Sequence, residues 1–221
     1  MCESLIGVLF CKLKKTMKKT LIIFALIFIG HLSIAQSVGV YSSYLAPSKK
    51  YSKPLPSPKS SYTIGLETVF NINTKFKLKT GIEYVSSKYA SSYSLIDYLG
   101  NKKGIVSYEN TLNYIGIPIG LRYEFKGQKI NPFLGSDIKP SLLIGSVYKN
   151  NYTKNKLNTL GSNKLLVNAS IVGGFKFNTT KKTYITTSAA YNFQVNDTYK
   201  SYSGVKFDGV SFSVSFGIKL K

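Results

Sequence analysis

The strongest constraint in this sequence is an alternation of apolar residues with small or polar ones at a period of two. It is clearest at positions 210–220, where every second residue is apolar and the others are serine, glycine or lysine. Successive side chains of a strand point to opposite faces, so this segment predicts a strand with one wholly apolar face. At about 3.3 Å per residue and a tilt of about 45°, such a strand covers roughly 25 Å of membrane height.

The same alternation recurs along the chain and predicts eight strands within one domain. Tyrosine and phenylalanine supply much of the apolar content, and glycine, serine and threonine fill the gaps, a mixture that favours strands over helices. The predicted strands are 38–45, 62–70, 76–84, 115–125, 134–144, 167–177, 185–193 and 210–220.

The connections decide between two kinds of barrel. A soluble ligand-binding barrel hides its apolar face, whereas a membrane barrel displays that face to lipid. Short connections at 71–75, 126–131 and 178–182 alternate strictly with long ones at 46–60, 86–107, 147–164 and 194–207. Outer-membrane barrels sort their connections in this way, with short periplasmic turns and long outward loops. We therefore expect an all-β, eight-stranded antiparallel up-and-down transmembrane β-barrel, with a soluble periplasmic ligand-binding barrel as the alternative.

The first 35 residues predict an export signal. Two lysines precede an apolar stretch at 21–29 that is too short to span a bilayer, and small residues follow at the positions that signal peptidase reads. We expect cleavage between Ala35 and Gln36, translation from Met17 rather than from an upstream extension, and an outer-membrane β-barrel domain at 36–221.

Removal of the signal also removes both cysteines, Cys2 and Cys11, and the single histidine, His31. The mature chain then has no disulfide and no lipid-anchor cysteine, and it lacks the imidazole and thiolate groups that zinc sites, cysteine nucleophiles and Ser-His-Asp triads need. We therefore predict no catalytic, cofactor-binding or metal-binding residues and no enzymatic activity. Mechanisms that use carboxylates alone stay open.

The chain is strongly basic, with a formal net charge of +21. Anionic lipid, acidic polysaccharide and nucleic acid all suit such a charge. Export and the presence of a single arginine, Arg122, argue against nucleic acid, because base readout relies on arginine. We expect membrane lipid as a partner, and lipopolysaccharide or another envelope protein as partners of basic outward loops. The alternative is a solvated rim with tyrosine anchors. The loop lysines and tyrosines are Lys49, Lys50, Tyr51, Lys53, Lys102, Lys103, Lys149 to Lys156, Tyr199, Lys200 and Tyr202.

Charged residues on the polar faces of the strands form the candidate site. Charges that face lipid near the midplane cost about 2–4 kcal/mol each, so we assign these residues to the lumen. An eight-stranded barrel is just wide enough for side chains to fill it, which predicts a paired, packed network rather than a channel. A pair of carboxylates acting as acid and base, Glu67 and Glu83, is a further alternative, opposed by Lys77 and Lys79 as neutralising partners. The predicted network is Glu67, Lys77, Lys79, Glu83, Arg122, Glu124, Asp137, Lys139 and Lys176.

Three segments carry a family resemblance. They are the signal that ends Ser-Ile-Ala before Gln36, the strand Leu-Asn-Tyr-Ile-Gly-Ile-Pro-Ile-Gly-Leu-Arg-Tyr at 112–123, and the strand start Asn-Pro-Phe-Leu-Gly at 131–135. In these the chain resembles the PorT-like outer-membrane β-barrel proteins of Bacteroidetes, although it lacks the terminal aromatic residue that is common in outer-membrane strands. The resemblance implies an eight-stranded outer-membrane barrel and, for some members, a link to protein secretion. We expect a structural or interaction component of the cell envelope, linked to secretion or envelope assembly, with a narrow solute channel as the alternative.

Overall fold

The computed structural model describes residues 35–48, 56–127, 129–150, 154–155, 162–200 and 204–220. The compact unit Gln36–Lys221 contains all the strands. They are β1 (Ser37–Pro47), β2 (Ser57–Asn71), β3 (Phe76–Ile96), β4 (Lys102–Gly116), β5 (Ile119–Glu124), β6 (Ile130–Asn150), β7 (Lys154–Asn155), β8 (Leu165–Asn178), β9 (Thr183–Gln194) and β10 (Gly209–Lys219). Apart from Ala35, the predicted signal peptide, with Met17, Cys2, Cys11 and His31, lies outside the described residues, so it stays a prediction.

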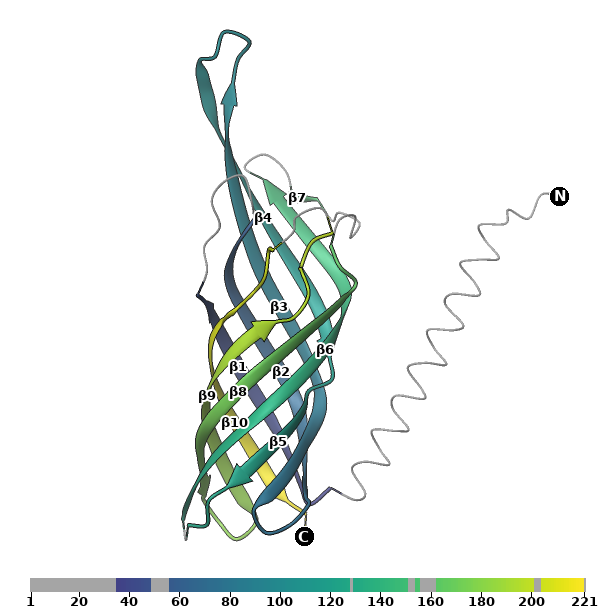
Figure 1. Cartoon of the computed structure of the whole chain (residues 1–221), viewed down its shortest axis with the longest axis vertical. Coiled ribbons are helices and arrows are strands. Elements are labelled where there is room, and N and C mark those ends of the chain that lie inside the picture. The colour runs from purple at the N-terminus through teal and green to yellow at the C-terminus, as the bar shows by residue number, and fades with distance from the viewer. Residues whose placement is uncertain are drawn as a thin grey trace, which may run out of the picture. The chain divides into compact units, whose positions relative to one another are not determined.

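The strands close into one antiparallel ring (Figure 1). β1 pairs with both β2 and β10, so the first and last strands of the ring meet and no edge is left open. β4 and β5 together take the place of one strand between β3 and β6, and the two-residue β7 pairs antiparallel with the end of β6. The prediction of an all-β, eight-stranded antiparallel barrel is confirmed.

The strand predicted at 115–125 is broken in two. β4 ends at Gly116 and β5 begins at Ile119, because Pro118 has no N–H to donate to the ladder. At the break, the Ile117 amide donates to the carbonyl of Pro140, 3.0 Å away, so the wall stays continuous.

Several strands extend into segments that we predicted to be loops. β3 and β4 continue to Ile96 and from Lys102, so most of the predicted 86–107 loop is a hairpin that reaches past the other strands (Figure 1). Its tip turns at Asp97, whose Oδ1 accepts hydrogen bonds from the amides of Leu99 and Asn101 at 2.9 and 2.8 Å. β2 and β6 likewise extend into the loops predicted at 46–60 and 147–164.

The outer face of the barrel wall is apolar, and much of its inner face is polar. Ile64, Ile171 and Val214 point outward and are each more than half exposed. The inward positions beside them carry glycine, serine or threonine, except for Val172. In water, barrels with such an apolar outer surface would aggregate, whereas among acyl chains the surface is stable. This is therefore the arrangement of a barrel surrounded by lipid. No helix of the described residues is long and apolar enough to cross a membrane.

Outward aromatic side chains gather near both ends of the wall. Near the short turns, the ring of Tyr123 lies 5.2 Å from that of Phe76 and 4.9 Å from that of Phe125, measured between centroids. Near the other end, Tyr44 contacts Tyr62 at 5.1 Å. Aromatic belts of this kind sit at the headgroup level of a membrane.

Candidate functional site

The lumen near the short turns is built around Glu67 of β2, which is only 1% exposed. Its Oε2 lies 3.1 Å from Nζ of Lys79 on β3 and 3.8 Å from a terminal nitrogen of Arg122 on β5. All three side chains are buried. Because a buried charge is tolerated only when it is paired, each member of this cluster depends on the others.

A second carboxylate, Glu83 of β3, belongs to a separate cluster. The Tyr41 hydroxyl donates a hydrogen bond to Glu83 Oε2, and Nζ of Lys139 lies 4.0 Å from the same oxygen. The ammonium of Lys79 lies 4.7 Å from the centre of the Tyr41 ring, so Tyr41 links the two clusters.

A third cluster lies closest to the turns. Nζ of Lys176 is 3.5 Å from Oε1 of Glu124 and 4.4 Å from the centre of the Tyr184 ring, and the Tyr184 hydroxyl donates to Ser37 Oγ at 3.2 Å. Lys77 is buried nearby and donates to the backbone carbonyl of Asn73 at 3.3 Å. Its assignment as a partner of a glutamate is wrong, because the cations beside Glu67 and Glu83 are Lys79, Arg122 and Lys139.

All nine residues of the predicted network lie on inward-facing positions of the strands. Among the described side chains, three buried atoms of the network have no hydrogen-bond partner: Oε1 of Glu67, Nε of Arg122 and Oδ1 of Asp137. The same residues line a cavity of about 30 Å³. That space suffices for one or two water molecules, which would satisfy these atoms.

The other half of the lumen is filled by the connection between β9 and β10. We call its described residues, 195–200 and 204–208, the lid. Val205 is fully buried and Phe207 nearly so, and both pack into an apolar cluster with Tyr89, Leu112, Tyr114, Leu166 and Tyr199. The prediction that 194–207 is an outward polar loop, with Tyr199 on an exposed surface, is therefore wrong, because these apolar side chains are buried inside the barrel mouth.

Side-chain hydrogen bonds hold the lid in place. Gln194 donates from Nε2 to Thr198 Oγ1 at 2.9 Å and accepts at Oε1 from the Phe207 amide, also at 2.9 Å. Asp208 Oδ1 accepts from the Gln194 amide at 2.7 Å. The lid was missed because its polar residues resemble those of a solvated loop. One signal was available, since Phe207 continues the inward register of Gly209 and Ser211 on β10.

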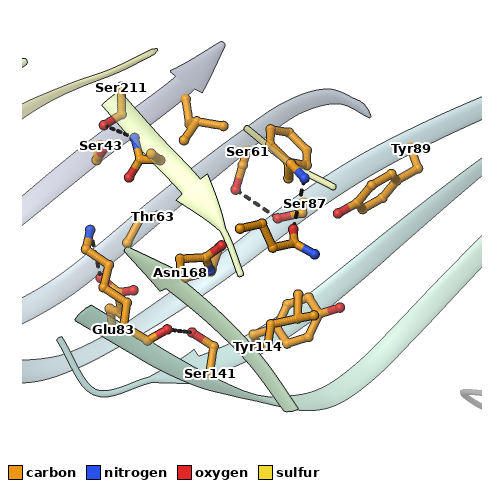
Figure 2. A pocket seen from close by; sticks show the side chains of 17 residues that line it. Ser43, Ser61, Thr63, Glu83, Ser87, Tyr89, Tyr114, Ser141, Asn168 and Ser211 are labelled. Atoms are coloured by element: carbon orange, nitrogen blue, oxygen red, sulfur yellow. Dashed lines mark hydrogen bonds and ion pairs between the residues drawn. The ribbon is translucent and has the colours of Figure 1, made fainter. Parts of the chain in front are cut away.

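A cavity of about 60 Å³ separates the lid from the charged clusters. Figure 2 shows Tyr89 and Tyr114 on one side of it and Glu83 on the other. Two of its lining residues, Ser61 and Ser87, are joined by a hydrogen bond of 2.9 Å. Pockets for small ligands usually measure about 300–1,000 Å³, so this space fits a few waters and no larger ligand. Within the described part of the chain, no group of three or more His, Cys, Asp or Glu residues could hold a metal ion.

The predicted outward lysines and tyrosines are described only in part. Lys103, Lys149 and Lys200 are exposed at the end opposite the short turns. Lys102 and Lys154 lie in β4 and β7 rather than in loops. Lys49, Lys50, Tyr51, Lys53, Lys156 and Tyr202 lie outside the described residues.

A family model described as "Outer membrane protein beta-barrel domain" matches residues 31–200. Among solved structures, Neisserial surface protein A is similar at 13% identity and a TM-score of 0.50, covering 84% of this chain and 98% of that one. OprG from Pseudomonas aeruginosa is similar at 12% identity and a TM-score of 0.47, covering 84% and 96%. No protein of curated function is significantly similar in sequence.

The prediction that the chain has no enzymatic activity is corrected by these comparisons. The matching structures include the outer membrane enzyme PagL, at 16% identity and a TM-score of 0.41 over 82% of this chain and 99% of that one. They also include the outer membrane protease OmpT from Escherichia coli, at 9% identity and a TM-score of 0.32 over 83% and 92%.

Proposed function

The chain belongs to the family of outer membrane protein β-barrel domains, and on this premise we propose that it is a closed barrel that serves as a structural or interaction component of the cell envelope. Its place is the bacterial outer membrane, where its apolar wall contacts lipid. We propose that it does not conduct solutes.

The filling of the lumen at two levels carries this proposal. The lid and its apolar cluster occupy the outward mouth, and the cluster of Glu67, Lys79 and Arg122 occupies the lumen near the short turns. The two cavities within these regions, of about 60 and 30 Å³, have room for only a few water molecules. A conducting path would require both the lid and the cluster of Glu67, Lys79 and Arg122 to move.

Recording from planar bilayers tests the closed lumen. We expect the purified barrel to insert without producing stepwise conductance. The variant Val205→Asp places a charge in the apolar cluster and so expels the lid. It should also show no conductance, because the cluster of Glu67, Lys79 and Arg122 still blocks the lumen. Stepwise conductance of the unaltered protein, scaling with its concentration, would show that the barrel is a channel.

Two finer parts of the proposal rest on the sequence. We propose a PorT-like role in secretion or envelope assembly from the 112–123 and 131–135 segments, and an export signal ending at Ala35. We also propose that exposed outward lysines, among them Lys103, Lys149 and Lys200, contact lipopolysaccharide or an acidic partner by screened Coulomb attraction.

A further inference from the structure

Six lysines surround the short-turn end of the barrel, and we call them the turn lysines. They are Lys75, Lys126, Lys129, Lys181, Lys182 and Lys219. The first five are exposed and Lys219 is half-buried. None of the three turns, at 71–75, 125–129 and 179–182, contains an aspartate or a glutamate.

The charge of the turn lysines is not compensated locally. The closest carboxylate along the chain is Glu124, and it faces the lumen, where it pairs with Lys176 at 3.5 Å. The opposite end of the barrel differs, because its lysines are accompanied by acids such as Asp97, Glu109 and Asp197. Positive charge without nearby acid is therefore a property of the short-turn end.

Five of the turn lysines are exposed at the turns, next to the wall that faces lipid, whereas Lys219 is half-buried at an inward-facing position of β10. Nζ of Lys75 is 5.8 Å from the centre of the Tyr123 ring, which packs between the outward rings of Phe76 and Phe125. Since an aromatic belt marks the headgroup level, this ammonium sits where lipid phosphates lie. Lysine suits this position because its stem covers apolar surface while its charge reaches the headgroups.

We propose that the turn lysines bind anionic phospholipid headgroups in the leaflet at the short-turn end, which is the periplasmic leaflet for an outer-membrane barrel. A soluble acidic polymer of the periplasm is disfavoured, because the contact of Lys75 with Tyr123 holds that amine against the lipid-facing wall. The inference rests on the membrane placement and not on the closed lumen, so a conducting barrel would leave it intact.

Electron spin resonance of spin-labelled lipids tests the inference in phosphatidylcholine vesicles that contain the full barrel. We expect spin-labelled phosphatidylglycerol to associate with the protein at least roughly threefold more strongly than spin-labelled phosphatidylcholine. In a variant with all six turn lysines changed to glutamine, the ratio should fall to about one, because the attraction is electrostatic. Heat-modified gel migration checks that the variant is folded.

A matched variant places the same six Lys→Gln changes at the opposite end. The changed residues are Lys59, Lys88, Lys103, Lys149, Lys164 and Lys200. This variant should keep most of the phosphatidylglycerol preference. The proposal is overturned by an unaltered protein without preference, by a turn-lysine variant that keeps it, or by an opposite-end variant that loses it. A further result would overturn it in favour of a carbohydrate polymer. In that case the turn-lysine variant would no longer co-sediment with purified peptidoglycan but would keep its phosphatidylglycerol preference.

Discussion

Replacing Glu67 with glutamine should lower the free energy of unfolding of the barrel by about 3–5 kcal/mol, the range for removing one partner of a buried ion pair. The reason is that two buried cations remain after the substitution. Lys79 and Arg122 are both buried, and Glu67 is the carboxylate within 4 Å of each. Without it, two like charges face each other in a lumen with little water. Urea titration of the protein folded in lipid vesicles measures the change.

An exposed ion pair supplies the matched control for Glu67→Gln. Lys88 and Glu109 lie 3.8 Å apart across β3 and β4, and their side chains are 45% and 43% exposed. The same chemical change there, Glu109→Gln, should cost less than about 1 kcal/mol, because water screens the pair. Equal effects of the two substitutions would contradict a buried cluster in which Lys79 and Arg122 depend on Glu67.

A thiol placed at Val205 should react with a polar maleimide roughly 100-fold more slowly than one placed at Val195. The two valines belong to the same lid, but Val205 is 0% exposed and Val195 is 59% exposed. If opening the lid costs about 3 kcal/mol, the buried thiol is accessible about 1% of the time. The measurement uses Val205→Cys and Val195→Cys in a chain whose Cys2 and Cys11 are changed to serine.

Packing of the apolar cluster should determine how slowly the thiol at position 205 is labelled. Phe207→Ala removes a buried aromatic ring, a loss worth about 3–5 kcal/mol in a protein core. Added to Val205→Cys, it should raise the labelling rate to within about tenfold of the rate at Val195. Similar rates at the two valines in the otherwise unaltered lid would mean that the segment is an outward loop, as the sequence alone suggested.

The strands could be predicted where lipid imposes a rule on them. Between residues 210 and 220 one face must be apolar and the other must not, so the period of two is unmistakable. Beyond the membrane that rule no longer applies. The outward positions of β3 there include Ser86 and Lys88, and the hydrophobic alternation disappears although the backbone ladder continues to Ile96. For this reason the long hairpin could not be recognised.

The inward position of each charged residue could be predicted, but its partner could not. Pairing depends on the registers between strands, such as Lys79 opposite Gly120 and Arg122 opposite Gly135. These registers place β5 beside β3, so that Arg122 reaches Glu67 on β2. These registers follow from turn geometry and the break at Pro118, neither of which has a periodic signal. The lid was beyond reach for a similar reason, since hydrogen bonds of Gln194 and Asp208 shape it.

The placement of the apolar wall against lipid can be tested with a single tryptophan, because the chain has none of its own. Ile115 and Tyr114 are neighbours at one depth, but Ile115 points outward at 38% exposure and Tyr114 points inward at 1%, beside a cavity. In vesicles with brominated acyl chains, we expect strong quenching of tryptophan fluorescence for Ile115→Trp and little for Tyr114→Trp. Quenching of Tyr114→Trp alone, or of neither variant, would contradict a barrel whose apolar face meets the acyl chains.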